Sequence, residues 1–149
     1  PRAVLMAGYK DTSSSDAVYM LDWYAYGIGK VPTKVATTYQ NISDAWSLLI
    51  DQKWHDRITA IKANDGGLSY VEFFEYRKNK MSIPLFNIYC ATGSNREYYA
   101  ERTDLIQLGQ TTQAIYFAKL TNEGEQSELA LTGDEIKARF SLVNQAWNN

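Results

Sequence analysis

The chain has 149 residues, of which 45% are hydrophobic and 21% are charged, and its formal net charge is −2. This composition excludes a disordered chain, and the opening apolar run at residues 3–7 is far too short to cross a bilayer. One His and one Cys exclude most zinc sites, Cys/His nucleophile pairs and intramolecular disulfide bonds. The densest basic cluster is only Arg77, Lys78 and Lys80, so we expect no nucleic-acid partner. We also expect no cofactor and no membrane insertion.

Short stretches of alternating apolar and polar residues recur along the chain between clusters of Gly, Asn, Asp and Ser, which predicts β-strands. Eight strands are expected, at residues 3–7, 17–26, 58–63, 68–76, 84–91, 96–103, 112–121 and 126–131. Residues 64–67, Asn-Asp-Gly-Gly, tolerate the positive backbone dihedrals of a tight turn and predict a hairpin. The pattern predicts a mainly β fold, an antiparallel β-sandwich or jelly roll, in one domain over residues 1–149.

Two short helices complete the expected fold. Trp46, Leu49 and Ile50 follow Ser43 at helical spacing, which predicts a helix over residues 43–53 with Ser43 as its N-cap.

The second helix is expected near the C-terminus. Thr132 and Glu135 form the pattern of a capping box, in which the side chain of each residue bonds the backbone N–H of the other. We expect the helix that follows to bury Ile136 and Phe140.

Residues 65–73 are similar to the second half of an EF-hand calcium loop, with Gly66 at position six and Glu72 at position twelve. Positions one and three of such a loop fall on Ile61 and Ala63, whose side chains carry no oxygen. The hairpin is therefore favoured, and no metal site is predicted.

Two further motifs have simpler interpretations. His55 lies beside Asp56, but a catalytic triad also needs a nucleophile, so we interpret His55 as a surface or capping residue. Residues 41–43, Asn-Ile-Ser, match the N-glycosylation pattern, which we discount because no signal peptide accompanies it.

Aromatic residues at the loop ends of predicted strands are the strongest functional hint. Such rings stack on the apolar face of a sugar while nearby polar groups bind its hydroxyls, and the same side chains serve protein interfaces. Adjacent Tyr98 and Tyr99 cannot both face the core of a strand, so one of them should be exposed. The candidate ligand-binding residues are Asp16, Trp23, Tyr24, Tyr26, Ser94, Asn95, Tyr98 and Tyr99.

Residues 129–144, LALTGDEIKARFSLVN, combine a predicted strand with a capped terminal helix and resemble the C-terminal ends of tailed-bacteriophage fibre, spike or needle proteins. This resemblance implies a homotrimeric, β-rich knob at the tip of a virion appendage that recognises a cell-surface glycan or protein. It also fits a chain that begins at Pro1, since a shaft would precede that residue in a longer protein.

The leading hypothesis is therefore a non-enzymatic receptor-recognition domain. One alternative is a carbohydrate-active enzyme that uses paired carboxylates, such as Asp22 with Glu72, which is expected on the same strand face as Tyr70, Phe74 and Tyr76. A second alternative is a structural or inhibitory protein-interaction module whose aromatic residues are buried at an interface.

Overall fold

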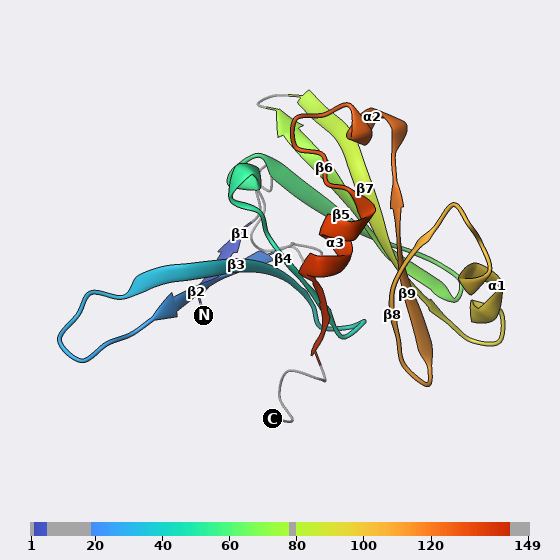
Figure 1. The fold of residues 1–149 in the computed structure, drawn as a ribbon, viewed down its shortest axis with the longest axis horizontal. Coiled ribbons are helices and arrows are strands. Elements are labelled where there is room, and N and C mark those ends of the chain that lie inside the picture. The colour runs from blue at the N-terminus through green and yellow to red at the C-terminus, as the bar shows by residue number, and fades with distance from the viewer. Residues whose placement is uncertain (1, 6–18, 78–79, 144–149) are drawn as a thin grey trace.

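The computed structural model describes residues 2–5, 19–77 and 80–143, whose strands form two five-stranded antiparallel sheets (Figure 1). The first sheet has the order β1 (Arg2–Leu5), β2 (Tyr19–Ala25), β3 (Thr33–Asn41), β4 (Trp46–Leu49) and β10 (Phe140–Leu142). The second has the order β5 (Ile58–Asp65), β6 (Leu68–Arg77), β7 (Lys80–Thr92), β9 (Ala114–Leu120) and β8 (Ile106–Gln110). The mainly β, antiparallel sandwich predicted from the sequence is confirmed.

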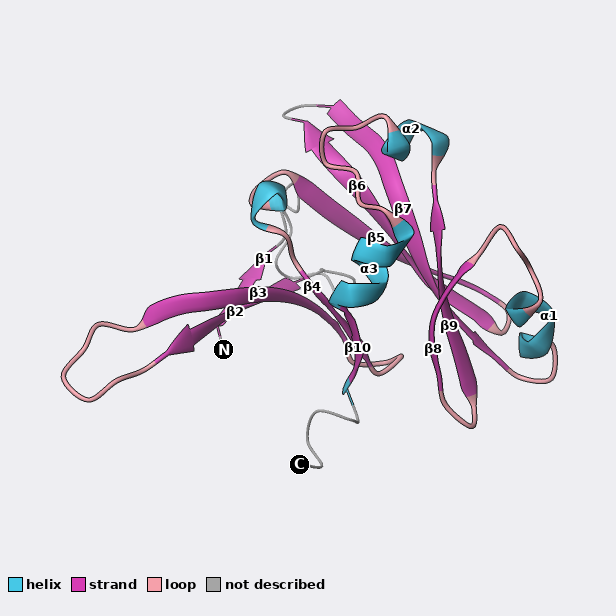
Figure 2. Cartoon of the chain, in the orientation of Figure 1, coloured by secondary structure: helices cyan, strands magenta, loops and turns pink. Residues whose placement is uncertain are grey.

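The helices are short and lie in the connections between strands (Figure 2). They are η1 (Gln52–Trp54, a 3-10 helix), α1 (Arg96–Ala100), α2 (Asn122–Glu125) and α3 (Gly133–Arg139). No helix in the described part of the chain is both long enough and apolar enough to cross a membrane.

Strands β2, β5, β6, β7 and β9 fall where the sequence predicts them, and β1 covers the described residues of the expected strand at 3–7. The β5–β6 hairpin forms as expected, because Asp65 pairs with Leu68 and Gly66 takes a φ of 61°. Strands β3, β4, β8 and β10 are additional to the prediction, so the described residues hold more strands than expected.

The predicted helix over residues 43–53 is wrong, because this stretch forms a turn, strand β4 and η1. Trp46 and Leu48 are buried while Leu49 is 40% exposed, so the apolar side chains alternate with the period of a strand. The φ of Ala45 is 59°, which lies outside the helical region, and β4 pairs with both β3 and β10.

Two predicted strands are also wrong. Residues 96–103 contain helix α1, whose Tyr99 ring packs on Phe117 of β9 at a centroid distance of 5.4 Å. Residues 126–131 form no strand, because side chains take their backbone acceptors: Trp54 Nε1 donates to the Leu129 carbonyl at 2.8 Å and Lys53 Nζ to the Ala130 carbonyl at 3.0 Å.

The C-terminal helix begins as predicted but ends earlier. Both hydrogen bonds of the Thr132–Glu135 capping box are present, and Ile136 is fully buried. Phe140 is buried as expected but is not helical, because it pairs with Leu48 and opens β10.

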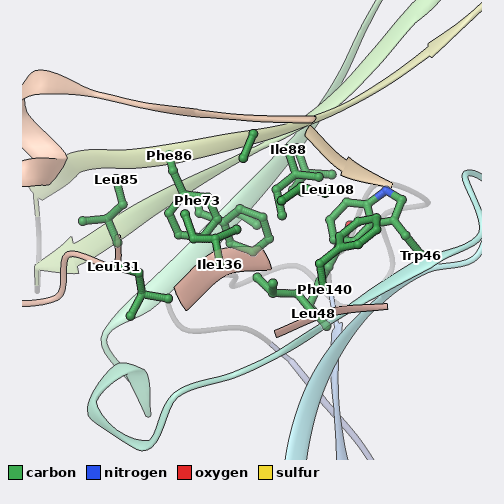
Figure 3. Close-up of a cluster of buried hydrophobic side chains, with 14 of the residues drawn as sticks. Trp46, Leu48, Phe73, Leu85, Phe86, Ile88, Leu108, Leu131, Ile136 and Phe140 are labelled. Carbon is green, nitrogen blue, oxygen red and sulfur yellow. The ribbon is translucent and has the colours of Figure 1, made fainter. Parts of the chain in front are cut away.

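The hydrophobic core lies between the two sheets and α3 (Figure 3). The Phe73 and Phe86 rings of the second sheet stack at 4.9 Å, and Tyr39 of the first sheet meets Phe73 edge-on at 5.5 Å. Trp46 stacks on Phe140 at 5.8 Å. Aromatic pairing therefore joins the sheets.

Trp54 supplies the first test of this core. Its side chain is fully buried, and the substitution Trp54→Phe would leave the Leu129 carbonyl without its indole donor. We expect the free energy of unfolding, measured by urea denaturation, to fall by about 1–3 kcal/mol. His55→Ala, at an exposed neighbour, is the matched control; equal stabilities of the two variants would contradict this role.

Glu75 is the most deeply buried acid in the described chain, at 2% exposure. Its carboxylate accepts hydrogen bonds from Ser127 Oγ at 2.8 Å and Arg77 Nε at 3.1 Å, and Arg57 lies 3.9 Å away. Burial alone would raise the pKa of Glu75, but these partners outweigh it and hold the pKa below its ordinary value.

This lowered pKa predicts an acid-sensitive fold. Between these two pKa values the folded chain binds fewer protons at Glu75 than the unfolded chain. The contribution of Glu75 to the free energy of unfolding is therefore present above the ordinary pKa of 4.5 and is lost as pH falls through the lower pKa of the folded state. Urea denaturation across this range should show a smaller pH dependence for Glu75→Gln than for the unaltered protein. Identical pH profiles would contradict the assignment.

Candidate functional site

The candidate ligand-binding residues separate into two groups, while Asp16 lies outside the described residues. One group consists of Trp23, Tyr24 and Tyr26; the other consists of Ser94, Asn95, Tyr98 and Tyr99. The first belongs to the β2–β3 hairpin, which projects at the left of Figure 1, and the second belongs to α1 and its preceding loop at the right edge. The structure does not bring the two groups into one site.

Individual side chains within these groups differ in exposure. Tyr26 is 77% exposed and Tyr98 is 64% exposed. Trp23 is partly buried, and its Nε1 donates to Thr38 Oγ1 at 2.9 Å, so this indole forms part of the first sheet. Tyr99 packs on Phe117, so Tyr98 is the exposed member of the adjacent pair.

Three connections of the second sheet meet near α1 and form what we call the loop end. The Thr92 N–H donates to the Gly67 carbonyl at 2.9 Å, which joins the β5–β6 turn to the end of β7. The Arg96 guanidinium donates to the carbonyls of Gly93 at 2.8 Å and Thr112 at 3.3 Å. These bonds join the loop that carries Ser94 and Asn95 to the β8–β9 turn.

The β3–β4 connection, residues 41–45, is here called the Asp44 turn. Asn41 Oδ1 accepts hydrogen bonds from Ser43 Oγ at 2.9 Å and from the Asp44 N–H at 3.1 Å. Asn41 is only 4% exposed, so its side chain holds the turn and is not presented for glycosylation. The sequence signal here was the Asn-x-Ser-Asp pattern, which also describes this type of turn.

The Asp44 turn of the first sheet is tied to the second sheet at the loop end. Ser69 Oγ of β6 donates to Asp44 Oδ2 at 2.7 Å, and the Tyr116 hydroxyl of β9 donates to the Asp44 carbonyl at 2.7 Å. Within the described residues, side-chain hydrogen bonds reach the Asp44 carboxylate only at Oδ2, from Ser69 and from Asn41 Nδ2 at 3.4 Å. Oδ1 accepts no hydrogen bond from the described residues.

Two polar hollows flank the Asp44 turn. The first, which we call the Tyr70 hollow, has a volume of about 350 Å³, and its wall includes Asn41, Asp44, Lys62, Asn64, Ser69 and Tyr70. The second has a volume of about 480 Å³, and its wall includes Ser43, Thr92, Thr111, Thr112, Gln113 and Tyr116. Both walls present hydroxyl and amide groups beside apolar surface, which suits a ligand rich in hydroxyl groups.

A row of aromatic rings crosses the outer face of the second sheet. Tyr70 and Tyr89 lie 5.2 Å apart, Tyr89 and Phe117 5.0 Å, and Phe117 and Tyr99 5.4 Å between ring centroids. Tyr98 continues the row at 5.5 Å from Tyr99. The row joins the predicted residues of α1 to Tyr70 of β6, a connection that depends on strand pairing and cannot be read from the sequence.

The acid pair considered for hydrolysis lies on two different sheets. Asp22 of β2 accepts a hydrogen bond from Thr37 Oγ1 at 2.7 Å and forms an ion pair with Lys34 Nζ at 2.8 Å. Burial raises the pKa of Asp22, but these partners outweigh it and lower the pKa overall. Glu72 lies on the partly exposed face of β6, as the alternation predicts. Within the described residues, no three His, Cys, Asp or Glu side chains gather as in a metal site.

Comparison of the chain with protein-family models, curated proteins and solved structures found no match. The fold and the loop end together define an antiparallel β-sandwich with polar hollows at one end. Any functional assignment therefore depends on the geometry of these hollows.

Cys90 provides a test of the packing beneath the second hollow. Burial, helped by the negative charge of Asp44, raises the pKa of this thiol from 9.0 to about 11. At pH 8 the thiolate fraction is thus about a hundredfold below that of an unperturbed thiol. We expect a thiol reagent to react at least about a hundredfold faster with Cys90 of the urea-unfolded protein than with Cys90 of the folded protein. Comparable rates would contradict the packing.

Proposed function

We propose that this protein is a non-enzymatic carbohydrate-binding domain that recognises a glycan at the loop end, around the Asp44 turn. The observation that carries the proposal is the Tyr70 hollow, whose wall combines amide, hydroxyl, carboxylate and ammonium groups. Such groups donate and accept the hydrogen bonds that the hydroxyl groups of a sugar ring need.

The fixed geometry of the hollow supports the same ligand class. Asp44 is held by Ser69 and by the Tyr116 hydroxyl, so its carboxylate is oriented before a ligand arrives. Preorganised acceptors lower the entropic cost of binding a polar ligand. The volume of about 350 Å³ lies at the lower end of the range of about 300–1,000 Å³ for small-ligand sites, which fits the end of a glycan chain.

The resemblance of residues 129–144 to phage appendage proteins supports a biological context for this binding. In that context the glycan belongs to a bacterial cell surface, and the domain is the homotrimeric tip of a virion tail appendage. Tyr98, which is 64% exposed at the end of the aromatic row, offers a further stacking surface outside the hollow, so a polysaccharide of several sugars is the preferred ligand.

A glycan array is the direct test. We expect retention of the protein on a restricted set of oligosaccharides, and intact masses of those sugars after incubation. Absence of binding across bacterial surface glycans would contradict the proposal, and shortened oligosaccharides would favour the enzyme alternative instead.

Substitutions in the Tyr70 hollow test the location. Asn64→Ala removes an exposed amide from the hollow, and Tyr70→Ala removes the first ring of the aromatic row beside it, so each should raise the Kd of the retained glycan about tenfold or more. Tyr76→Ala is the matched control, because Tyr76 lies on the same face at the other end of β6. Affinities unchanged in both hollow variants would place the site elsewhere.

A further inference from the structure

Residues 23–36 of the β2–β3 hairpin form an arm that extends beyond the other strands of the first sheet (Figure 1). Four large apolar side chains on this arm are exposed to solvent: Tyr26 by 77%, Ile28 by 106%, Val31 by 86% and Val35 by 63%. Monomeric proteins rarely expose such a concentrated apolar patch unless it binds something.

Both edges of the arm are free within the described residues. Strand β1 pairs with β2 only at Tyr19–Asp22, and β4 pairs with β3 only at Thr38–Asn41. Beyond these points the arm is a two-stranded ribbon, which is marginally stable alone and offers unpaired backbone groups to another strand.

A hollow of about 700 Å³ lies at the base of the same arm and is here called the base hollow. The apolar side chains in its wall include Met20, Ala36 and Ile50, and charged groups also line it. Among these, Arg139 forms an ion pair with Asp51 at 2.6 Å. The base hollow therefore offers an apolar surface edged by Lys34 and by the Arg139–Asp51 ion pair.

The charges of the arm complement the rest of the chain. Residues 26–36 contain Lys30 and Lys34 but no acidic residue, so they carry a charge of +2. Because the whole chain has a formal charge of −2, the remainder carries −4. An arm of one molecule is thus attracted to the body of another.

We propose that the arm binds a second copy of this chain, with its tip in the base hollow of that copy. Tip and base hollow lie at opposite ends of one arm, so two arms lying antiparallel satisfy both contacts at once and bring their free strand edges together. Ile28 and Val31 fill the apolar part of the hollow. This contact does not depend on glycan binding.

Sedimentation equilibrium of the full chain tests the assembly. We expect dimers from reciprocal exchange, or trimers if each arm passes to the next molecule around a ring, and both contain the proposed contact. Ile28→Asp and Val31→Asp should raise the dissociation constant about tenfold or more, because each places a charge in the hollow. Both positions are exposed in the single chain, so folding should be retained, as circular dichroism can verify.

Ile42→Asp is the matched control, because Ile42 is 84% exposed but lies in the Asp44 turn, outside the arm. It should leave the assembly unchanged. A protein that is monomeric at all accessible concentrations would overturn the proposal, and so would an oligomer that persists in both arm variants.

Cross-linking between variants locates the contact. We expect a short bis-maleimide to join Ile28→Cys to Gln52→Cys when the two variants are mixed, since Gln52 lines the base hollow. Cys90 is buried and should not react, and a mixture of Ile42→Cys with Gln52→Cys is the control. Failure to join the first pair, or equal joining of the control pair, would overturn the contact while leaving the glycan site untouched.

Discussion

The arrangement of the two sheets depends on the hydrogen bonds of Asp44. Its carbonyl accepts from Tyr116 and its carboxylate accepts from Ser69, so one residue of the first sheet is bound to two strands of the second. The next residue, Ala45, accepts from the Val143 N–H, which fixes the chain just beyond β10. The Asp44 turn lies against the second sheet, where its carbonyl groups lose contact with water, and these hydrogen bonds replace the lost bonds to water. They also orient the polar groups of the loop end.

The arm contrasts with the loop end, where hydrogen bonds hold the two sheets together. From Trp23 to Ala36 no third strand covers the ribbon within the described residues, and apolar side chains at its tip remain in water. A polar hollow with fixed acceptors suits a hydrated, hydroxyl-rich ligand, whereas an apolar tip gains free energy only by burial against protein. The two ends therefore match partners of different chemistry, and binding at one need not compete with the other.

The sequence predicted correctly those strands in which apolar and polar residues alternate over many positions and whose turns contain residues that favour one turn conformation. The β5–β6 hairpin is the clearest example, with Gly66 at a positive φ. The helix expected at residues 43–53 failed because Trp46 and Leu48 fit a strand as well as Trp46 and Leu49 fit a helix. A short apolar run cannot decide between the two periods, and the pairing of β4 with β3 and β10 decided it.

The candidate site was predicted only in part, for a related reason. Ser94 and Tyr98 were predicted because aromatic and polar residues adjoin in the sequence, but neither lines a hollow beside the Asp44 turn, whereas Asp44 and Tyr70 become neighbours only through long-range pairing. The position of Trp23 near a Gly-rich loop indicated an exposed side chain. Its indole instead donates a hydrogen bond to Thr38 within the first sheet. Composition thus indicated candidate residues by type, whereas their division between the loop end and the arm follows from strand pairing.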